Sequence, residues 1–267
     1  MINGNIYLMP EEQITSDSIS NKLPTRFVGR RSLCFNAVTS TMDIARQEAL
    51  KQAPEGTAIF AEVQTKGRGR LKREWLTPQG NIAVSIILYP PKSYLNSLIM
   101  LSSLSVKQTI EAVTGLKCQL KWPNDILIGG RKVAGILIET KILQDKVDYV
   151  VIGIGINVNL ILAKHPEIQK IATCLMDEVG APVSRLALLH QLFFEMEILY
   201  TSSLKGASLY PQWRDNLVTL GKPVRARNGD EVFEGVAESV KEDGSLMLRQ
   251  AGGKLLRFTV GDVTLRE

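Results

Sequence analysis

Histidine and cysteine are scarce in this chain. Its 267 residues include only two histidines and three cysteines. Cys34, Cys118 and Cys174 lie far apart and outside any CxxC pattern, so we expect reduced buried thiols rather than a disulfide framework or a zinc site. With only two histidines, the chain offers almost no residues for a His-based metal cluster or a Ser-His-Asp triad. We therefore assign no metal ligands from the sequence.

The sequence also lacks a long hydrophobic run. Its longest mostly apolar stretch, residues 149–163, is interrupted by Asn157 and Asn159 and is too short to cross a bilayer as a helix. Residues 1–20 show neither a basic leader nor a continuous apolar segment, which argues against a secretory signal. We therefore expect a cytoplasmic protein with no membrane partner.

Aromatic residues are few, at 6% of the chain, beside 45% hydrophobic and 22% charged residues. These values and a mean hydropathy of +0.03 are typical of soluble globular proteins and argue against disorder. The net charge of +5 and the pI near 9.1 fit nucleic acid, anionic small molecules or acidic proteins as partners. The length predicts one large or two unequal domains.

Apolar patterning divides the chain into three parts. Residues 1–26 are polar and too few for a helix-turn-helix domain, and we expect an N-terminal arm. Residues 27–218 predict an α+β domain, a mixed β-sheet covered by helices. Residues 219–267 predict a small β-barrel, because clusters of Asn, Asp and Gly separate short β-rich runs. In the middle part we expect strands at 32–38, 57–64, 81–89, 118–122, 125–128, 132–140 and 147–158, and helices at about 41–52, 95–113, 184–202 and 208–216.

The loop after the second expected strand alternates cations with glycine. Residues 64–70 have the sequence Gln-Thr-Lys-Gly-Arg-Gly-Arg. Glycine lets a backbone approach a ligand closely, and arginine offers fixed forks to carboxylate or phosphate oxygens. The pattern is typical of an anion-binding loop, but also of a solvated basic loop or of a glycine-arginine segment that contacts nucleic acid. By itself it favours the solvated loop.

The next segment, residues 121–137, changes that balance. Residues 121–125 end a strand and turn, and Lys132 then leads into a buried strand, where a point charge is little screened and acts strongly on a bound anion. Residues 153–157, Gly-Ile-Gly-Ile-Asn, are a weak dinucleotide fingerprint because no third glycine with a following helix is present. They fit a strand whose missing side chains admit a flat ring, and equally a tightly packed strand.

Taken in order, the motifs resemble those of the biotin protein ligases. The resemblance spans residues 27 to about 204, and the β-rich tail is similar to the SH3-like domain that follows in that family. It implies a class II synthetase-like sheet of the biotin/lipoate ligase type, with residues 27–218 as the catalytic domain. It rests on Ser40-Thr41 opening a helix, on residues 64–70, on Trp75, on KWPNDI from Lys121, on GRKVAGILIE from Gly130 and on GIGIN from Gly153.

The resemblance implies an ATP-dependent ligation in two steps. Biotin carboxylate attacks the α-phosphate of ATP to give biotinyl-5′-AMP and pyrophosphate, and a lysine amine of a biotin carboxyl carrier protein then displaces AMP. ATP, Mg²⁺ and biotin are the implied small molecules, and a carrier domain of a biotin-dependent carboxylase is the implied partner. Because both reactants of the first step are anions, the site needs the positive charge that Arg68, Arg70 and Lys132 supply.

The resemblance also assigns the site residues. Lys132 is expected to contact the biotin carboxyl and phosphate oxygens, Arg68 the phosphate, and Asp125 the acceptor amine. Asp125 equally fits a turn residue, and Trp75 fits either an adenine-stacking surface or a rim side chain. The implied catalytic residues are Lys132, Arg68 and Asp125; the implied biotin-binding residues are Ser40, Thr41, Gln64, Gly67, Arg68, Gly69, Arg70 and Lys132; and the implied adenylate-binding residues are Arg68, Arg70, Arg73, Trp75, Asn124, Lys132 and Asn157.

Two features depart from the family pattern. Met42 stands where many members have asparagine or glutamine, so a polar contact from that side chain is lost. Repressor-type members carry an N-terminal winged helix, for which residues 1–26 offer no room. We therefore expect a ligase that does not bind DNA as a repressor. Both a monomer and a homodimer remain open.

Three alternatives stand beside this interpretation. A lipoate or octanoate ligase would show an Arg-Arg-x-Ser-Gly-Gly-Gly type of loop and a histidine-containing strand, and neither occurs here. A nucleic-acid-binding module would use the basic loop, but the low aromatic content argues against it. A catalytically silent biotin-binding protein has no support, because Lys132, Arg68 and Arg70 are all present.

Overall fold

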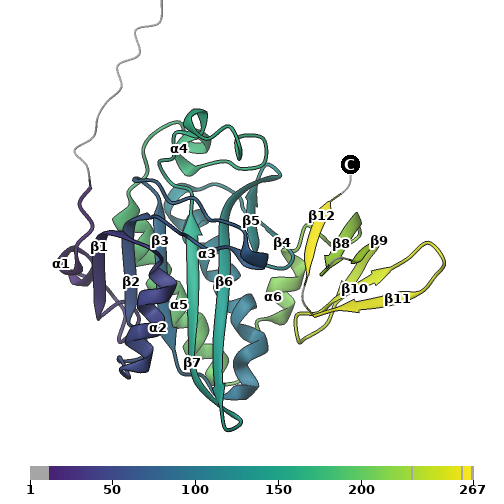
Figure 1. Cartoon of the computed structure of the whole chain (residues 1–267), viewed down its shortest axis with the longest axis horizontal. Helices are drawn as coiled ribbons and strands as arrows, with labels where there is room; N and C mark the ends of the chain where they lie inside the picture. The colour runs from purple at the N-terminus through teal and green to yellow at the C-terminus, as the bar shows by residue number, and fades with distance from the viewer. Residues whose placement is uncertain (1–11, 230, 260, 266–267) are drawn as a thin grey trace, which may run out of the picture.

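The computed structural model describes residues 12–229, 231–259 and 261–265 (Figure 1). Within them the larger sheet has seven strands in the order β1-β2-β3-β7-β6-β5-β4. Strands β1 and β2 are parallel and the other neighbours are antiparallel, so the predicted mixed sheet is confirmed. The strands are β1 (Ser32–Val38), β2 (Ala58–Gln64), β3 (Ile82–Leu88), β4 (Gln119–Lys121), β5 (Asp125–Ile128), β6 (Arg131–Leu143) and β7 (Lys146–Ile156).

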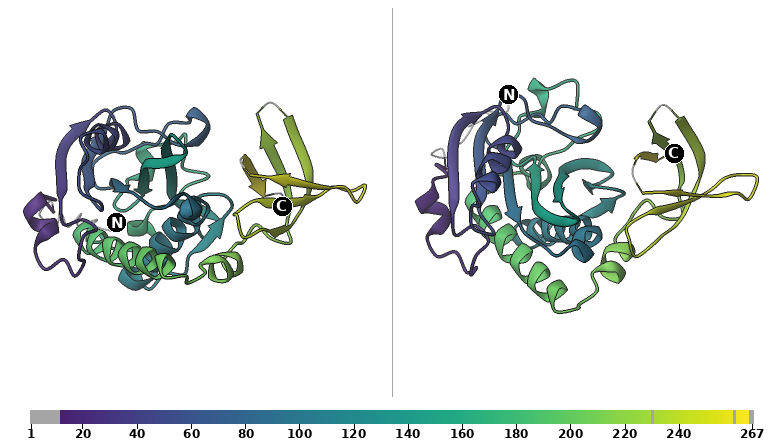
Figure 2. Two further views of the ribbon diagram at one scale, coloured as in Figure 1. Left: turned by 90° about the horizontal axis from the view of Figure 1, so that it is seen from below. Right: turned by 60° about the horizontal axis from the view of Figure 1, so that its bottom comes forward.

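Helices cover both faces of this sheet, because its central strands are apolar on both sides. Helix α2 (Thr41–Leu50) packs on one face, where Met42 and Ile59 belong to one buried cluster. Helices α3 (Leu98–Thr114) and α5 (Arg185–Leu204) lie against each other on the opposite face (Figure 2). Among the described residues, no helix is both long and apolar enough to cross a membrane.

The described part of the predicted N-terminal arm packs on the main domain. It includes the short helix α1 (Ser16–Ser20), which Thr15 caps and in which Ile19 is fully buried. The carboxylate of Glu197 in α5 accepts hydrogen bonds from the backbone N–H groups of residues 26–28. Residues 12–26 therefore contribute to the core, although their polar composition suggested an arm. Residues 1–11 of that prediction lie outside the described residues.

The C-terminal part forms a five-stranded antiparallel sheet in the order β11-β10-β9-β8-β12 among the described residues. It lies to one side of the main domain and follows the short helix α6 (Tyr210–Asp215) (Figure 1). The predicted fold class, a helix-covered mixed sheet followed by a small SH3-like β-domain, is confirmed. The strands are β8 (Pro223–Asn228), β9 (Glu231–Val240), β10 (Leu246–Arg249), β11 (Leu255–Phe258) and β12 (Asp262–Leu265).

Trp122, from the Lys-Trp-Pro-Asn-Asp segment, joins the two domains. Its side chain is 2% exposed. Its backbone N–H donates to Thr219 Oγ1 and its indole Nε1 donates to the Gly244 carbonyl, each at 2.9 Å. The turn that precedes Asp125 is therefore fixed against the C-terminal domain.

The structure differs from the sequence-based expectations mainly outside the core. Strand β6 extends to residue 143, beyond the expected 132–140, because its end pairs with β7 although Ile142 and Leu143 are exposed and do not alternate with polar residues. The hairpin turns at Gln144 and Asp145, which both have positive φ. Short helical segments that the apolar pattern did not reveal are α4 (Leu175–Val179) and the 3₁₀ turns at Arg70–Lys72, Lys92–Ser97 and Leu162–Lys164.

Candidate active site

The face of the larger sheet that carries α2 also carries the candidate site. Residues directly opposite on neighbouring strands share a face, and Gly135 lies opposite Gly155 while Ser85 lies opposite Gly153. A Cβ atom on Gly153 would come within 2.6 Å of the Met42 sulfur. The missing glycine side chains therefore let other groups approach the centre of the sheet directly.

Trp75 occupies the space above two of these glycines. A Cβ atom on Gly155 would lie 2.2 Å from the indole Nε1, and one on Gly135 would lie 3.0 Å from the ring. The Gly-Ile-Gly pattern was expected to admit a flat ring, and in this structure the ring is the chain's own tryptophan. Trp75 thus forms a half-buried wall over β6 and β7.

We call the segment that carries the cations, residues 65–73, the basic loop. Gly67 lets this loop lie close against Trp75. A Cβ atom on Gly67 would come within 2.3 Å of the Trp75 carbonyl oxygen, and the Trp75 N–H donates to the Gly67 carbonyl at 2.9 Å. Gly69 N–H donates to the Arg73 carbonyl at 2.8 Å, and Leu71 between them has a left-handed φ of 53°. Space, rather than φ, therefore requires glycine at position 67.

A chain of side-chain hydrogen bonds links α2 to β2 and β3. Gln64 Oε1 accepts from the N–H and the Oγ1 of Thr41 at 2.8 and 3.1 Å, and Gln64 Nε2 donates to Thr77 Oγ1 at 2.9 Å. Thr41 Oγ1 also lies 2.8 Å from Ser85 Oγ. Ser40 is 1% exposed, and its Oγ has no hydrogen-bond partner among the described residues. A buried hydroxyl without a partner costs free energy, so a polar ligand at Ser40 would be stabilised.

Lys132 and Asp125 form an ion pair at the side of Trp75. Lys132 Nζ lies 2.5 Å from Asp125 Oδ1 and 5.2 Å from the centre of the Trp75 ring. The side chains of Lys132 and Asp125 are only 31% and 18% exposed, and charges so placed are screened less than charges on an open surface. The structure therefore brings together one cation, one carboxylate and one aromatic ring that the sequence selected.

Asn124 and Asn157 use their amide groups within the protein. Asn124 Nδ2 donates to the Ile136 carbonyl at 2.8 Å, and Ile136 N–H donates back to the Asn124 carbonyl at 3.1 Å. Asn157, only 5% exposed, donates from Nδ2 to the Thr173 carbonyl at 3.0 Å. Both asparagines, which the resemblance assigns to the adenylate, hold backbone segments in place here.

Arg70 and Arg73 face the C-terminal domain. Arg70 Nη2 donates to the Gly261 carbonyl at 3.1 Å, and Arg73 Nη2 lies 2.5 Å from Asp262 Oδ2. Burial lowers the pKa of the Arg70 guanidinium, and the charges of Asp262 and Asp125 oppose that shift. The basic loop therefore bridges the two domains.

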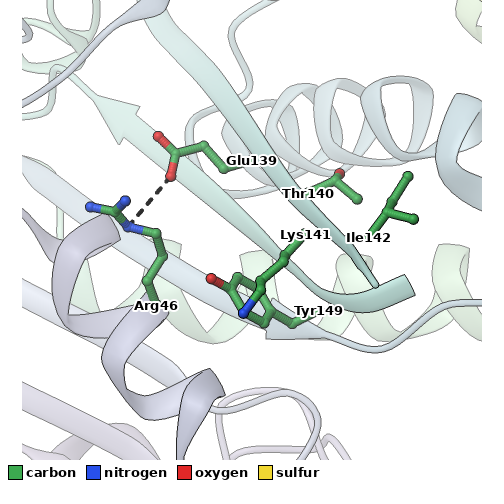
Figure 3. A pocket seen from close by; sticks show the side chains of 6 residues that line it. All are labelled: Arg46, Glu139, Thr140, Lys141, Ile142 and Tyr149. Atoms are coloured by element: carbon green, nitrogen blue, oxygen red, sulfur yellow. Dashed lines mark ion pairs between the residues drawn. The ribbon is translucent and has the colours of Figure 1, made fainter. Parts of the chain in front are cut away.

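Arg68 turns instead toward α2 and β6. Its Nη2 lies 2.9 Å from Asp43 Oδ1 and 3.3 Å from Glu139 Oε1. Arg46 Nε lies 3.7 Å from Glu139 Oε2, and Figure 3 shows this pair pointing toward one another. Arg46 and Glu139 line an open pocket of about 560 Å³ together with Thr140, Lys141, Ile142 and Tyr149.

Several polar residues of this site were missed from the sequence. Ser85 is the one polar side chain in the apolar strand β3, and that isolation is the signal that could have revealed it. Asp43 gave no distinct signal, because an acid in the first turn of a helix is explained by the helix dipole. Arg46 and Glu139 lie on different elements, and only the fold brings them to Arg68.

Metal-ligating side chains do not cluster in the part of the chain that the structure describes: no group of three or more His, Cys, Asp or Glu residues is placed to hold an ion. Mg²⁺ in nucleotide sites is commonly bound through one or two carboxylates together with substrate phosphates. Asp125, beside Lys132, offers one such carboxylate. This donor fits a Mg²⁺ ion that arrives with a nucleotide.

Comparison with known proteins identifies the family to which the chain is similar. Residues 34–157 match the model of the Biotin/lipoate A/B protein ligase family, and residues 219–266 match that of the Biotin protein ligase C terminal domain. A Biotin--[acetyl-CoA-carboxylase] ligase of Paracoccus denitrificans is 33% identical over 79% of this chain and 93% of its own length. A Bifunctional ligase/repressor BirA of Bacillus spizizenii is 34% identical over 90% of this chain and 76% of its own length.

A solved structure extends the similarity to the whole fold. The biotin protein ligase of Aquifex aeolicus, in complex with biotin and ATP, superposes with a TM-score of 0.76. Its sequence is 28% identical, and the match covers 89% of this chain and 99% of that one.

Proposed function

The chain belongs to the biotin protein ligase family and is a biotin ligase, and from this premise we propose that it activates biotin as biotinyl-5′-AMP and transfers it to a lysine of a biotin carboxyl carrier protein. The observation that carries the proposal is the position of Lys132. Its amine lies beside the Asp125 carboxylate and the Trp75 ring, on the glycine-lined face of the sheet.

Lys132 and Arg68 serve the first step. The biotin carboxylate forms a bond to the α-phosphorus of ATP, and the bond to pyrophosphate breaks. Negative charge gathers on the phosphate oxygens in the transition state, and fixed cations in a partly buried site stabilise it strongly. Lys132 is such a cation, since Asp125 and Trp75 hold its amine in place.

The hydroxyl and amide groups at the start of α2 hold the biotin head group. The biotin ureido ring carries both donors and acceptors, and the unpartnered Ser40 hydroxyl can satisfy one of them. Thr41 and Gln64 are already positioned by their mutual hydrogen bonds. The loop residues Gly67, Arg68, Gly69 and Arg70 close over biotin and the adenylate, and exclusion of water limits hydrolysis of the intermediate.

The adenylate lies against the Trp75 side chain that covers β6 and β7. Trp75 offers a stacking surface to adenine, with Arg70, Arg73, Asn124, Lys132 and Asn157 as the further adenylate contacts that the family pattern assigns. When bound, Mg²⁺ neutralises phosphate charge, and Asp125 would hold it.

Asp125 serves the second step. The acceptor lysine is protonated in water, so its amine must lose a proton before it attacks the mixed anhydride and displaces AMP. A half-buried carboxylate at the site can orient that amine and take its proton. We also propose that the protein acts in the cytoplasm, as a monomer or a homodimer, and without repressing transcription through DNA. The BirA relative is named as a bifunctional ligase/repressor.

Exchange of labelled pyrophosphate into ATP tests this proposal. We expect exchange that requires biotin and that does not occur with lipoate or octanoate. Exchange with lipoate or octanoate but not with biotin would overturn the proposed substrate. Ser40→Ala should raise the KM for biotin about fivefold or more, the loss expected for one hydrogen bond to a buried partner.

A further inference from the structure

Arg68 and three neighbouring charged side chains form a group of alternating sign. Arg68 Nη2 contacts Asp43 and Glu139, and Arg46 contacts the same two carboxylates. We call these four residues the Arg68 network. All four side chains are between 31% and 41% exposed, so the network lies at the edge of the site rather than in free solvent.

The network is attached to the site at two fixed points. Asp43 lies in the first turn of α2, two positions after Thr41, and Glu139 lies in β6, the strand that also carries Lys132. Arg70 and Arg73 of the same loop contact the C-terminal domain. The start of the loop is connected to α2 by the Gln64 side chain, and the N–H groups of Thr65 and Lys66 donate to the Val38 and Thr39 carbonyls. The ion pairs of Arg68 add a side-chain connection to α2 and β6 further along the loop.

We infer that Asp43 and Glu139 are positioning residues that hold Arg68, and with it the basic loop, over the sheet before ligands bind. This inference rests on the proposed role of Arg68 at the phosphate. Both carboxylates lie within ion-pair distance of Nη2, while the buried Nε and Nη2 of Arg68 make no hydrogen bond among the described residues. Buried donors without a partner cost free energy, so an anion that reaches these N–H groups would be stabilised.

Arg46 makes this arrangement compatible with an anionic ligand. Two carboxylates alone would repel a phosphate near Arg68. Arg46 contacts both of them and balances their charge, so the network has two positive and two negative groups. With its charges balanced, the network does not repel an anion that approaches Arg68.

Limited proteolysis of the ligand-free protein tests the holding role without any assay of activity. Trypsin cleaves after Lys66, Arg68, Arg70 and Arg73 when the loop opens. Asp43→Asn and Glu139→Gln should each increase cleavage in this loop, identified by mass spectrometry, about two- to fivefold, the range expected for one partly exposed ion pair. Glu48 lies on the same helix as Asp43. Glu48→Gln removes its ion pairs with Arg31 and Lys51 and should leave loop cleavage unchanged.

Steady-state kinetics supplies the second readout. In both variants the KM for ATP should rise about two- to fivefold while kcat stays near that of the wild type, because Arg68 itself is retained. Asp43→Glu, which keeps the carboxylate, should restore most of the lost affinity. Unchanged loop cleavage in both variants would overturn the inference, as would a lower KM for ATP, which would mean that the carboxylates compete with the phosphate.

The two readouts separate this inference from the proposed function. If the wild-type protein does not activate biotin, the ligase proposal fails, yet the proteolysis comparison still decides whether Asp43 and Glu139 hold the loop. If activity is present and proteolysis is insensitive to both substitutions, the holding role fails alone.

Discussion

The guanidinium of Arg73 lies 2.5 Å from the carboxylate of Asp262, and this pair joins the basic loop to strand β12 of the C-terminal domain. The neighbouring Arg70 donates to the Gly261 carbonyl. The C-terminal domain therefore contacts the same loop that Arg68 connects to α2 and to the larger sheet. Loop closure should depend on both domains.

Asp262→Asn should weaken loop closure. The substitution removes the charge partner of Arg73 and leaves the fold of β12 intact, so the KM for ATP should rise about two- to fivefold, the effect of one partly exposed ion pair. The pair should also weaken as salt concentration increases. Asp215→Asn removes the exposed pair with Arg214 and serves as the control. An equal change in both variants would argue against the interdomain contact.

Gly155→Ala should displace Trp75. The added methyl group would lie 2.2 Å from the indole, so either the ring moves or the strand shifts, at a cost of about 1–3 kcal/mol. Urea unfolding measures that loss, and a change in tryptophan fluorescence reports the moved ring. Gly252→Ala has open space around the new methyl group and should change neither property. A wild-type fluorescence spectrum and stability for Gly155→Ala would show that Trp75 does not lie on the glycines.

Ser85→Ala should lower stability and weaken biotin binding together. Thr41 Oγ1 would lose its 2.8 Å contact to Ser85, which costs about 1 kcal/mol for a buried hydroxyl pair. Isothermal titration should show a higher Kd for biotin, since Thr41 is then held less firmly. Ser20→Ala, which removes an exposed hydroxyl in α1, is the matched control. Unchanged affinity would exclude Ser85 from the biotin site.

The thiol of Cys118 should resist alkylation at pH 8 in the folded protein. Burial raises its pKa from 9.0 to about 12, because the thiolate is poorly solvated there, with Glu111 adding repulsion. The folded state therefore holds this proton more tightly than the unfolded state. The resulting stabilisation is complete below pH 9 and is lost as the pH rises from 9.0 toward about 12. The unfolding free energy of Cys118→Ala should fall less steeply over that interval, and a parallel fall in both proteins would contradict the assignment.

The sequence predicted the central elements well because their patterns are local. Strand β3 is apolar except for Ser85, and α2 begins at the second residue of the Ser40-Thr41 pair, so each could be placed from neighbouring residues alone. Glycines and cations at fixed spacing likewise indicated where the site lies. The family comparisons confirm the predicted family, with matches in both domains.

The remaining features depend on tertiary contacts that no local pattern contains. Glu139 meets Arg68 across separate elements, and Arg73 meets Asp262 across 189 positions of sequence. The burial of Ile19 likewise requires α5, which comes much later in the chain. Such contacts follow from how the strands and helices pack, and only the folded chain reveals them.

Transfer of labelled biotin to a purified biotin carboxyl carrier domain tests the central claim most directly. The comparison includes the wild type with Mg-ATP, a reaction without ATP, Lys132→Ala, and Arg131→Ala as a control on the same strand. The account predicts ATP-dependent labelling that falls about a hundredfold or more in Lys132→Ala and stays near the wild-type rate in Arg131→Ala. A wild-type rate in Lys132→Ala, or labelling by lipoate or octanoate in place of biotin, would contradict it.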